Sequence, residues 1–254
     1  MADTDRGSPE PAPGTGESTL ERAIKDLKGR LVREATFAIG MLESASEALL
    51  NIDAEAARGV VRRDDDIDRE EVIIEEECFR VLALHHPFAR DFRRVVSLMR
   101  INADLERVGD HSTSIAKVTI KLSVLEHVPP VPTSLGELAR RVPILCHGLL
   151  TALMTESPEG ARSTLTKDHD IDTLEKRLFE ECVQTMGTDR DARAAGLLYY
   201  RCGRELERIG DLMTNIAEDV LYLSTGHIVR HGEKKRLKAL ARADKARLPA
   251  PPTP

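Results

Sequence analysis

The sequence predicts an all-α protein built from two repeated three-helix bundles, with six long antiparallel helices lying side by side. Two observations predict this fold. Apolar residues recur at helical spacing through most of the 254 residues, and one motif occurs twice. Leu105-Glu-Arg-Val-Gly-Asp110 returns as Leu206-Glu-Arg-Ile-Gly-Asp211, at an offset of 101 residues. A repeat of this length indicates that the chain duplicates one structural unit.

The composition agrees with a helical bundle and excludes some partners. Aromatic residues make up only 3% of the chain and tryptophan is absent, so Leu, Ile, Val, Ala and Met must fill the core. The net charge of −6 argues against nucleic acid as a partner, because binding phosphates requires a basic face.

The sequence also indicates a cellular compartment. The N-terminus has no apolar signal core, and no apolar run reaches the roughly 18 residues of a membrane span. We therefore expect a cytoplasmic protein that meets membranes only through its partners. The four cysteines form no C-x-x-C motif and lie in apolar helical patterns, which predicts buried, reduced thiols.

The first half of the chain predicts a tail and one bundle. Residues 1–17 are rich in Pro, Gly, Ser and acidic residues, which predicts a disordered N-terminal tail. The first bundle is expected at residues 18–128. Its helices are predicted at residues 18–50, after a capping box, at 54–84, ended by the following proline, and at 89–125. The buried side of the second helix is expected to carry Ile73, Ile74, Phe79 and Leu82.

The second half repeats this pattern. A Pro-rich linker at residues 129–133 precedes the second bundle at 134–232. Its helices are predicted at residues 134–156, 157–186 and 189–224, with Ser157 as an N-cap and Gly226 as a terminator. Residues 233–254 are basic and end in prolines, which predicts a mobile tail. Gly109 and Gly210 recur inside the repeated motif, which predicts a close helix neighbour at each.

Four carboxylate pairs occupy repeat-equivalent positions. Each pair has i, i+4 spacing, so both side chains lie on one helix face and repel each other unless a cation lies between them. If the second and third helices of each bundle are adjacent, four carboxylates converge per bundle as a site for Mg, Ca, Mn, Fe or Zn. The alternative is a solvated face paired with Arg107 and Arg208. The pairs are Asp64 with Asp68, Glu106 with Asp110, Asp168 with Asp172, and Glu207 with Asp211.

Catalytic motifs of the common enzyme classes are absent from the sequence. There is no P-loop, no G-x-S-x-G and no nucleophile with a recognisable base, which weighs against a kinase or a hydrolase. A ferritin-like di-iron centre requires Glu-x-x-His on two helices, and the chain lacks this spacing.

Over about residues 20–231 the chain resembles the PhoU family. The resemblance rests on five segments, namely residues 100–110, Leu206 to Asp211, the Asp-x-x-Ile-Asp patterns at 64–68 and 168–172, and the closing Gly226-His-Ile-Val-Arg-His231. It implies two similar bundles whose four carboxylate pairs hold multinuclear metal clusters at the surface. The metal ligands would be Asp64, Asp68, Glu106, Asp110, Asp168, Asp172, Glu207 and Asp211.

The resemblance also implies a regulatory role without catalysis. Such a protein links the ATPase subunit of the phosphate ABC transporter to a membrane sensor histidine kinase, and it keeps the phosphate-starvation response off when phosphate is plentiful. We also expect a homodimer. The alternative function is a metal-dependent hydrolase that uses the same carboxylate clusters, for which no nucleophile, base or pocket can be named.

Overall fold

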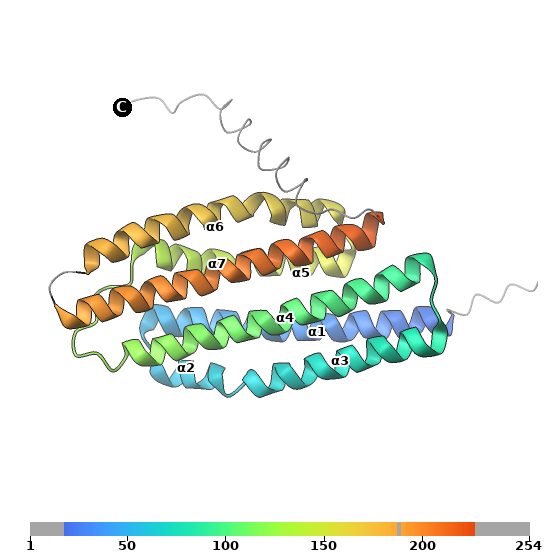
Figure 1. Ribbon diagram of the computed structural model, residues 1–254, viewed down its shortest axis with the longest axis horizontal. Helices are drawn as coiled ribbons and strands as arrows, with labels where there is room; N and C mark the ends of the chain where they lie inside the picture. Colours follow the sequence, from blue (N-terminus) through green and yellow to red (C-terminus); the bar gives the residue numbers. More distant parts are fainter. Residues whose placement is uncertain (1–17, 187–188, 227–254) are drawn as a thin grey trace, which may run out of the picture.

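The computed structural model describes residues 18–186 and 189–226, and in these residues it contains seven helices and no strand. Because the described residues form only helices, the prediction of an all-α fold is confirmed. Consecutive long helices run in opposite directions (Figure 1). None of these helices is long and apolar enough to cross a membrane. The predicted tails at 1–17 and 233–254 lie outside the described residues. The helices are α1 (Thr19–Asn51), α2 (Ala54–Val61), α3 (Asp64–His85), α4 (Ala89–Leu122), α5 (Thr133–Thr155), α6 (Pro158–Thr185) and α7 (Arg190–Thr225).

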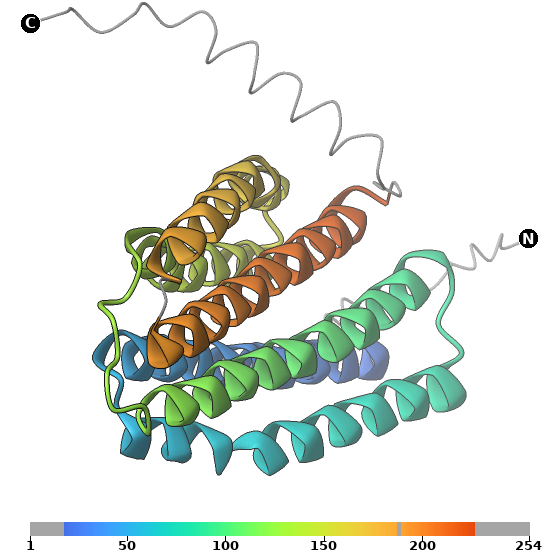
Figure 2. The same ribbon diagram turned by 60° about the vertical axis from the view of Figure 1, so that its left-hand side comes forward.

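The helices form two bundles that lie side by side. In the first bundle α4 packs against α1, α2 and α3, and in the second α7 packs against α5 and α6. The two bundles meet where α4 lies along α7 and α1 lies along α5 (Figure 2). Because α4 and α7 carry the repeated motif, the two copies of that motif lie at the centre of the molecule.

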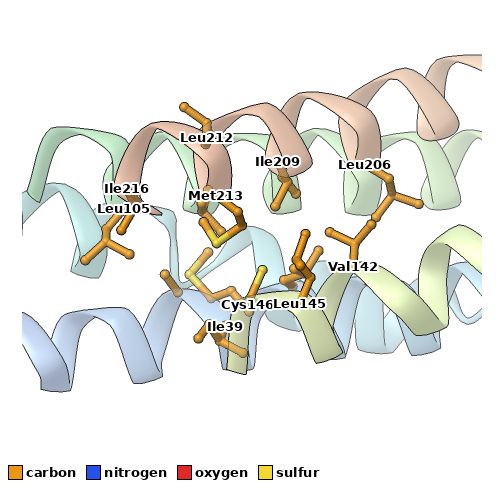
Figure 3. Close-up of a cluster of buried hydrophobic side chains, with 14 of the residues drawn as sticks. Ile39, Leu105, Val142, Leu145, Cys146, Leu206, Ile209, Leu212, Met213 and Ile216 are labelled. Atoms are coloured by element: carbon orange, nitrogen blue, oxygen red, sulfur yellow. The ribbon is translucent and has the colours of Figure 1, made fainter. Parts of the chain in front are cut away.

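Apolar side chains from both bundles fill the junction between them (Figure 3). Ile39 of α1 and Cys146 of α5 are buried there, together with Leu105 of α4 and Leu206 of α7. Adjacent residues of a helix point about 100° apart. Because Leu105 and Leu206 face the junction, the glutamates that follow them, Glu106 and Glu207, are turned away from it toward α3 and α6.

The caps predicted at Ser18, Ser157 and Gly226 are present. The Ser18 hydroxyl accepts a hydrogen bond from the Glu21 N–H at 3.1 Å, and the Ser157 hydroxyl accepts one from the Gly160 N–H at 3.1 Å. Gly226 follows α7 with a φ of 71°, which is the left-handed conformation that a helix terminator adopts. The helix starts and stops of the sequence are therefore confirmed at these positions.

The single second helix predicted at residues 54–84 is wrong, because the chain breaks it at Arg62 and Arg63 into α2 and α3. Three consecutive aspartates follow the break and form the first turn of α3, where negative charge is favourable next to the positive end of the helix dipole. The Arg63 guanidinium lies 5.9 Å from the centre of the Phe37 ring. In the second repeat Thr166 and Lys167 take the places of the two arginines, and α6 continues unbroken.

The prediction for the buried side of this segment was also partly wrong. Ile74 is buried, but Ile73 is 37% exposed and Phe79 is 53% exposed. The reason is a shift of one position, which turns a side chain by about 100° on a helix. The buried stripe of α3 consists of Ile67, Ile74, Cys78 and Val81. All four cysteines of the chain are buried and free, as predicted.

Gly109 lies on α4 where α3 packs against it, and a methyl group at this position is expected to destabilise the fold. A Cβ atom on Gly109 would lie 2.8 Å from Cδ1 and 3.0 Å from Cγ2 of the fully buried Ile67. Overpacking costs roughly 1 to 3 kcal/mol, against a gain in helix propensity of about 1 kcal/mol. Gly109→Ala should therefore lower the free energy of unfolding by about 1 kcal/mol in urea titrations.

Gly40 supplies the control for this substitution. It lies within α1, and a Cβ atom there would meet nothing within 4 Å. Gly40→Ala should raise the free energy of unfolding by up to about 1 kcal/mol. Gly210 is an intermediate case, since its Cβ would lie 3.3 Å from Ile171 Cδ1. If Gly109→Ala stabilises the protein as much as Gly40→Ala, α3 does not constrain the glycine.

Candidate metal-binding site

The predicted carboxylates gather where α3 packs on α4 and where α6 packs on α7. In the first bundle Glu106 of α4 interacts electrostatically with Asp68 and Glu71 of α3, and Asp68 interacts with Asp64 and Asp110. In the second bundle Glu207 of α7 interacts with Asp172 and Glu175 of α6 and with Asp211. We call Asp64, Asp68, Glu71, Glu106 and Asp110 the first cluster, and Asp168, Asp172, Glu175, Glu207 and Asp211 the second cluster.

Burial changes across each i, i+4 pair. The inner residues Asp64, Glu106 and Glu207 are half-buried, and Asp168 is only 2% exposed. The outer residues Asp68, Asp110 and Asp211 are exposed, and Asp172 is half-buried. Each cluster thus reaches from solvent down to the packed surface between two helices, so an ion from solution can enter it.

The carboxylates of the first cluster raise one another's pKa values. The pKa of Glu106 is raised to about 7, mainly by burial and then by the neighbouring Asp110, Glu71 and Asp68, while the charge of Arg107 lowers it. Burial and the neighbouring Asp64 and Asp110 also raise the pKa of Asp68. A bound cation would favour the ionised form of these groups, so these shifts describe a site that a cation would stabilise.

One oxygen of Asp64 is available for a ligand. Its Oδ1 atom is buried and has no hydrogen-bond partner in the part of the chain that the structure describes. Its Oδ2 atom lies 3.8 Å from Nζ of Lys117, at the long limit of an ion pair. A buried carboxylate oxygen without a donor is costly, and coordination of a metal ion would satisfy it.

The arginines of the alternative interpretation contact other residues. Arg107 pairs with Asp104 at 3.5 Å, and Arg208 pairs with Glu205 at 3.4 Å. Neither partner belongs to a cluster. Each arginine thus pairs with a carboxylate outside the clusters, and the charge of Arg107 also lowers the pKa of Glu106.

Two cluster members escaped the sequence analysis although the repeat contained a signal for them. Glu71 and Glu175 are related by the same offset of 104 residues as Asp68 and Asp172, and each lies three positions after that aspartate. On a helix this spacing continues the same face. A search for repeat-equivalent carboxylates beyond the i, i+4 pairs would have found both.

Glu34 of α1 was also missed. It is 2% exposed, and neither of its carboxyl oxygens has a hydrogen-bond partner within the described ranges. Burial is the main cause that raises its pKa to about 9, and Glu70, Glu71 and Glu106 add to it. Its sequence signal is a charged residue on the apolar stripe of α1, seven positions after Leu27 and three after Leu31.

The second cluster also contains a positively charged side chain, Arg204, that the sequence analysis missed. Nη1 of Arg204 lies 3.5 Å from Oε1 of Glu175 and 3.3 Å from Oε2 of Glu207. The Tyr200 hydroxyl donates a hydrogen bond to Glu175 Oε1 at 3.0 Å. Arg204 and Tyr200 thus hold Glu175 of α6 against α7.

As they stand, the side chains are too far apart to share one ion. Among residues 18–186 and 189–226, no group of three His, Cys, Asp or Glu side chains is close enough to hold a metal. The helices bring the carboxylates into electrostatic contact, and side-chain rotation would have to bring their oxygens together around a cation. The donor set itself, made only of carboxylates, suits a hard cation.

Comparison with known sequences identifies relatives of the chain. The family profile described as the PhoU domain matches residues 31–119 and 135–220, one match in each bundle. The phosphate-specific transport system accessory protein PhoU homolog of Clostridium acetobutylicum is 30% identical over 208 residues, which is 82% of this chain and 94% of the relative. The homolog of the same name from Pseudomonas aeruginosa is 32% identical over 215 residues, 85% of this chain and 89% of the relative.

Solved structures show the same arrangement of helices. The crystal structure of PhoU from Pseudomonas aeruginosa superimposes with a TM-score of 0.79 at 30% sequence identity. The match covers 82% of this chain and 100% of that chain. The phosphate transport system regulatory protein PhoU from Streptococcus pneumoniae gives a TM-score of 0.76 at 29% identity, covering 84% of this chain and 100% of that chain.

Proposed function

This chain belongs to the PhoU family, and we propose that it is a regulatory accessory protein of phosphate transport. In this proposal it links the ATPase subunit of the phosphate ABC transporter to a membrane sensor histidine kinase and holds the phosphate-starvation response off. It would act in the cytoplasm as a homodimer and reach the membrane only through these partners. The observation that supports the proposal most is the double PhoU-domain match, which spans both bundles.

The relatives are named as accessory and regulatory proteins, and we propose no catalytic step for this chain. The hydrolase alternative has no observation in its favour.

The regulatory role can be tested in a bacterium that lacks its own PhoU-type protein and carries a reporter driven by a phosphate-starvation promoter. The full chain should lower reporter output in phosphate-rich medium, and purified chain should bind the purified transporter ATPase subunit. A reporter that stays fully active, together with no binding to the ATPase subunit, would reject the adaptor role.

We further propose that both clusters hold metal ions, in multinuclear form, with Fe, Zn, Mg, Mn or Ca as candidates. The ligands would be the four predicted pairs, joined by Glu71 and Glu175. Support comes from Oδ1 of Asp64, which has no hydrogen-bond partner among the described residues, and from burial and the neighbouring carboxylates, which together raise the pKa of Glu106. The metal would supply the positive charge that holds α3 to α4 and α6 to α7.

Removal of two carboxylates of the first cluster tests this metal proposal. The double variant Glu106→Ala with Asp110→Ala should lose most of the metal of the first bundle, because it removes both ligands that α4 contributes. Its stability in the presence of a chelator should stay unchanged or rise slightly, since like charges at i, i+4 repel by a few tenths of a kcal/mol. Elemental analysis of protein purified without added metal or chelator gives the metal content.

The matched control is Glu76→Ala with Arg80→Ala, an exposed i, i+4 pair on α3 outside both clusters. It should leave the metal content as it is in the unmodified protein. Negligible metal in the unmodified protein, with both double variants near neutral in stability with and without chelator, would remove the metal from the proposal and leave the adaptor role untouched.

A further inference from the structure

The two clusters contain the same carboxylates at repeat-equivalent positions. Asp64, Asp68 and Glu71 map onto Asp168, Asp172 and Glu175 at an offset of 104 residues. Glu106 and Asp110 map onto Glu207 and Asp211 at an offset of 101 residues. Any difference between the clusters must therefore come from the residues around these carboxylates.

The first difference is a cation. Arg204 lies among the second cluster, where one guanidinium nitrogen contacts both Glu175 and Glu207. The position equivalent to Arg204 in the first repeat is Ala103. In the part of the chain that the structure describes, no lysine or arginine forms an ion pair with Glu71 or Glu106, and Arg107 and Arg69 act on Glu106 and Asp68 only through their charge.

The second difference is a buried acid. Glu34 of α1 lies almost fully buried beside Glu71 and Glu106, and neither of its oxygens has a hydrogen-bond partner within the described residues. The equivalent position in α5 is Leu138, which is fully buried and apolar. The first cluster thus contains one more carboxyl group and lacks the guanidinium of the second.

Lys117 partly offsets this difference. It approaches Oδ2 of Asp64 at 3.8 Å, while its equivalent in the second repeat is Glu218. The Lys117 side chain is 56% exposed and contacts one carboxylate at the edge of the first cluster. Arg204 contacts two carboxylates from two helices at shorter distances, so its effect on an incoming cation is the larger one.

From these contacts we infer that the two clusters are unequal cation sites: the first needs a cation from solution, whereas Arg204 is the resident counter-cation of the second. The inference rests on the proposed metal-binding function. A divalent ion entering the second cluster must move the Arg204 guanidinium aside or lie next to its charge. Either event weakens binding, and repulsion at about 4 Å near a protein surface corresponds to roughly a tenfold or larger loss of affinity.

The test compares the clusters one at a time in the full chain. Glu207→Ala with Asp211→Ala leaves only the first cluster, and Glu106→Ala with Asp110→Ala leaves only the second. Each protein is stripped with chelator and titrated with Mn²⁺ by calorimetry, and Mn²⁺ electron paramagnetic resonance counts the bound ions. The first cluster alone should bind Mn²⁺ about tenfold more tightly than the second cluster alone.

Exchanging the residue at the repeat-equivalent position should reverse this order. Arg204→Ala in the protein with only the second cluster should tighten Mn²⁺ binding about tenfold, and Ala103→Arg in the protein with only the first cluster should weaken it about tenfold. Ala103→Gln adds a long uncharged side chain and should change the affinity by much less. Arg204→Lys keeps the charge and should bind as weakly as the unmodified second cluster. Circular dichroism confirms that each variant keeps its helices.

The possible outcomes separate the inference from the function on which it rests. Equal affinities for the two clusters, with no effect of either exchange, would overturn the inference and leave the proposed metal binding in place. If neither cluster binds Mn²⁺, including after Arg204→Ala, the metal-binding function and the inference both fail. If Ala103→Gln weakens binding as much as Ala103→Arg, side-chain volume and not charge sets the affinity, which also overturns the inference.

Discussion

Replacing Glu34 by leucine is expected to stabilise the metal-free protein by on the order of 4 kcal/mol at pH 8, but only by on the order of 1 kcal/mol at pH 5. The pKa of this buried carboxyl is raised from 4.5 to about 9, mainly by burial and then by Glu70, Glu71 and Glu106. Leucine is the residue that the second bundle carries at the equivalent position, Leu138, where it packs in the core.

The direction of the pH dependence follows from where the proton is held. The unfolded chain releases the proton of Glu34 near pH 4.5, whereas the folded chain keeps it until about pH 9. Between these values the folded state binds more protons, so stability falls as the pH rises, by roughly 1.4 kcal/mol per pH unit for this one group. The stability that the folded chain gains by keeping Glu34 protonated is fully present below pH 4.5 and is lost by about pH 9.

Urea titrations in the presence of chelator from pH 5 to pH 9 measure the effect. Glu34→Gln is the control, because it removes the titration but keeps a buried polar group. It should flatten the pH dependence like leucine and give little stabilisation at pH 5, since its amide has no better partners than the acid. A Glu34→Leu variant with the pH dependence of the unmodified protein would show that Glu34 reaches water in the folded state.

The fold could be predicted from the sequence because the repeat, the helical periodicity and the caps all gave the same answer. Ser18 and Ser157 begin helices by local hydrogen bonds, and Gly226 ends one by its backbone conformation. These effects depend only on neighbours in the sequence. The break at Arg62 and Arg63 could not be predicted in the same way. Nothing in the helical pattern of residues 54–84 stops there, and the contact of Arg63 with Phe37 depends on packing against α1.

In the candidate site, too, features set by local spacing could be predicted and contacts between helices could not. The i, i+4 spacing placed Glu106 and Asp110 on one face of α4, and adjacent helices brought them to Asp68 of α3. The residues that distinguish the two clusters were missed because they act across helices. Arg204 has the same spacing to Glu207 that many solvated pairs have, and only the packing of α6 on α7 shows that it also reaches Glu175.

The second large effect on stability is expected at Gly203 of α7. The two repeats carry different residues with different contacts at this position. Its equivalent, Asn102 of α4, donates a hydrogen bond to the Glu71 carbonyl at 2.9 Å. Around Gly203 the space is taken by leucines instead: a Cβ atom there would overlap Cδ2 of the fully buried Leu178 and lie 3.8 Å from Cδ1 of Leu138. The second bundle has thus replaced a buried polar contact by apolar packing that only glycine allows.

Gly203→Ala is therefore expected to lower the free energy of unfolding by about 2 kcal/mol or more, because overpacking outweighs the gain of about 1 kcal/mol in helix propensity. Gly148→Ala is the control within the same bundle, since a Cβ atom there meets nothing within 4 Å, and it should be neutral or stabilising. Leu178→Val shortens the side chain that the new methyl group meets, so the double variant should lose less than the two single variants together in a double-mutant cycle. Additive losses would mean that the backbone of α7, and not the Leu178 side chain, responds to the methyl group. Close packing of α6 on α7 would then not be the reason for glycine at position 203.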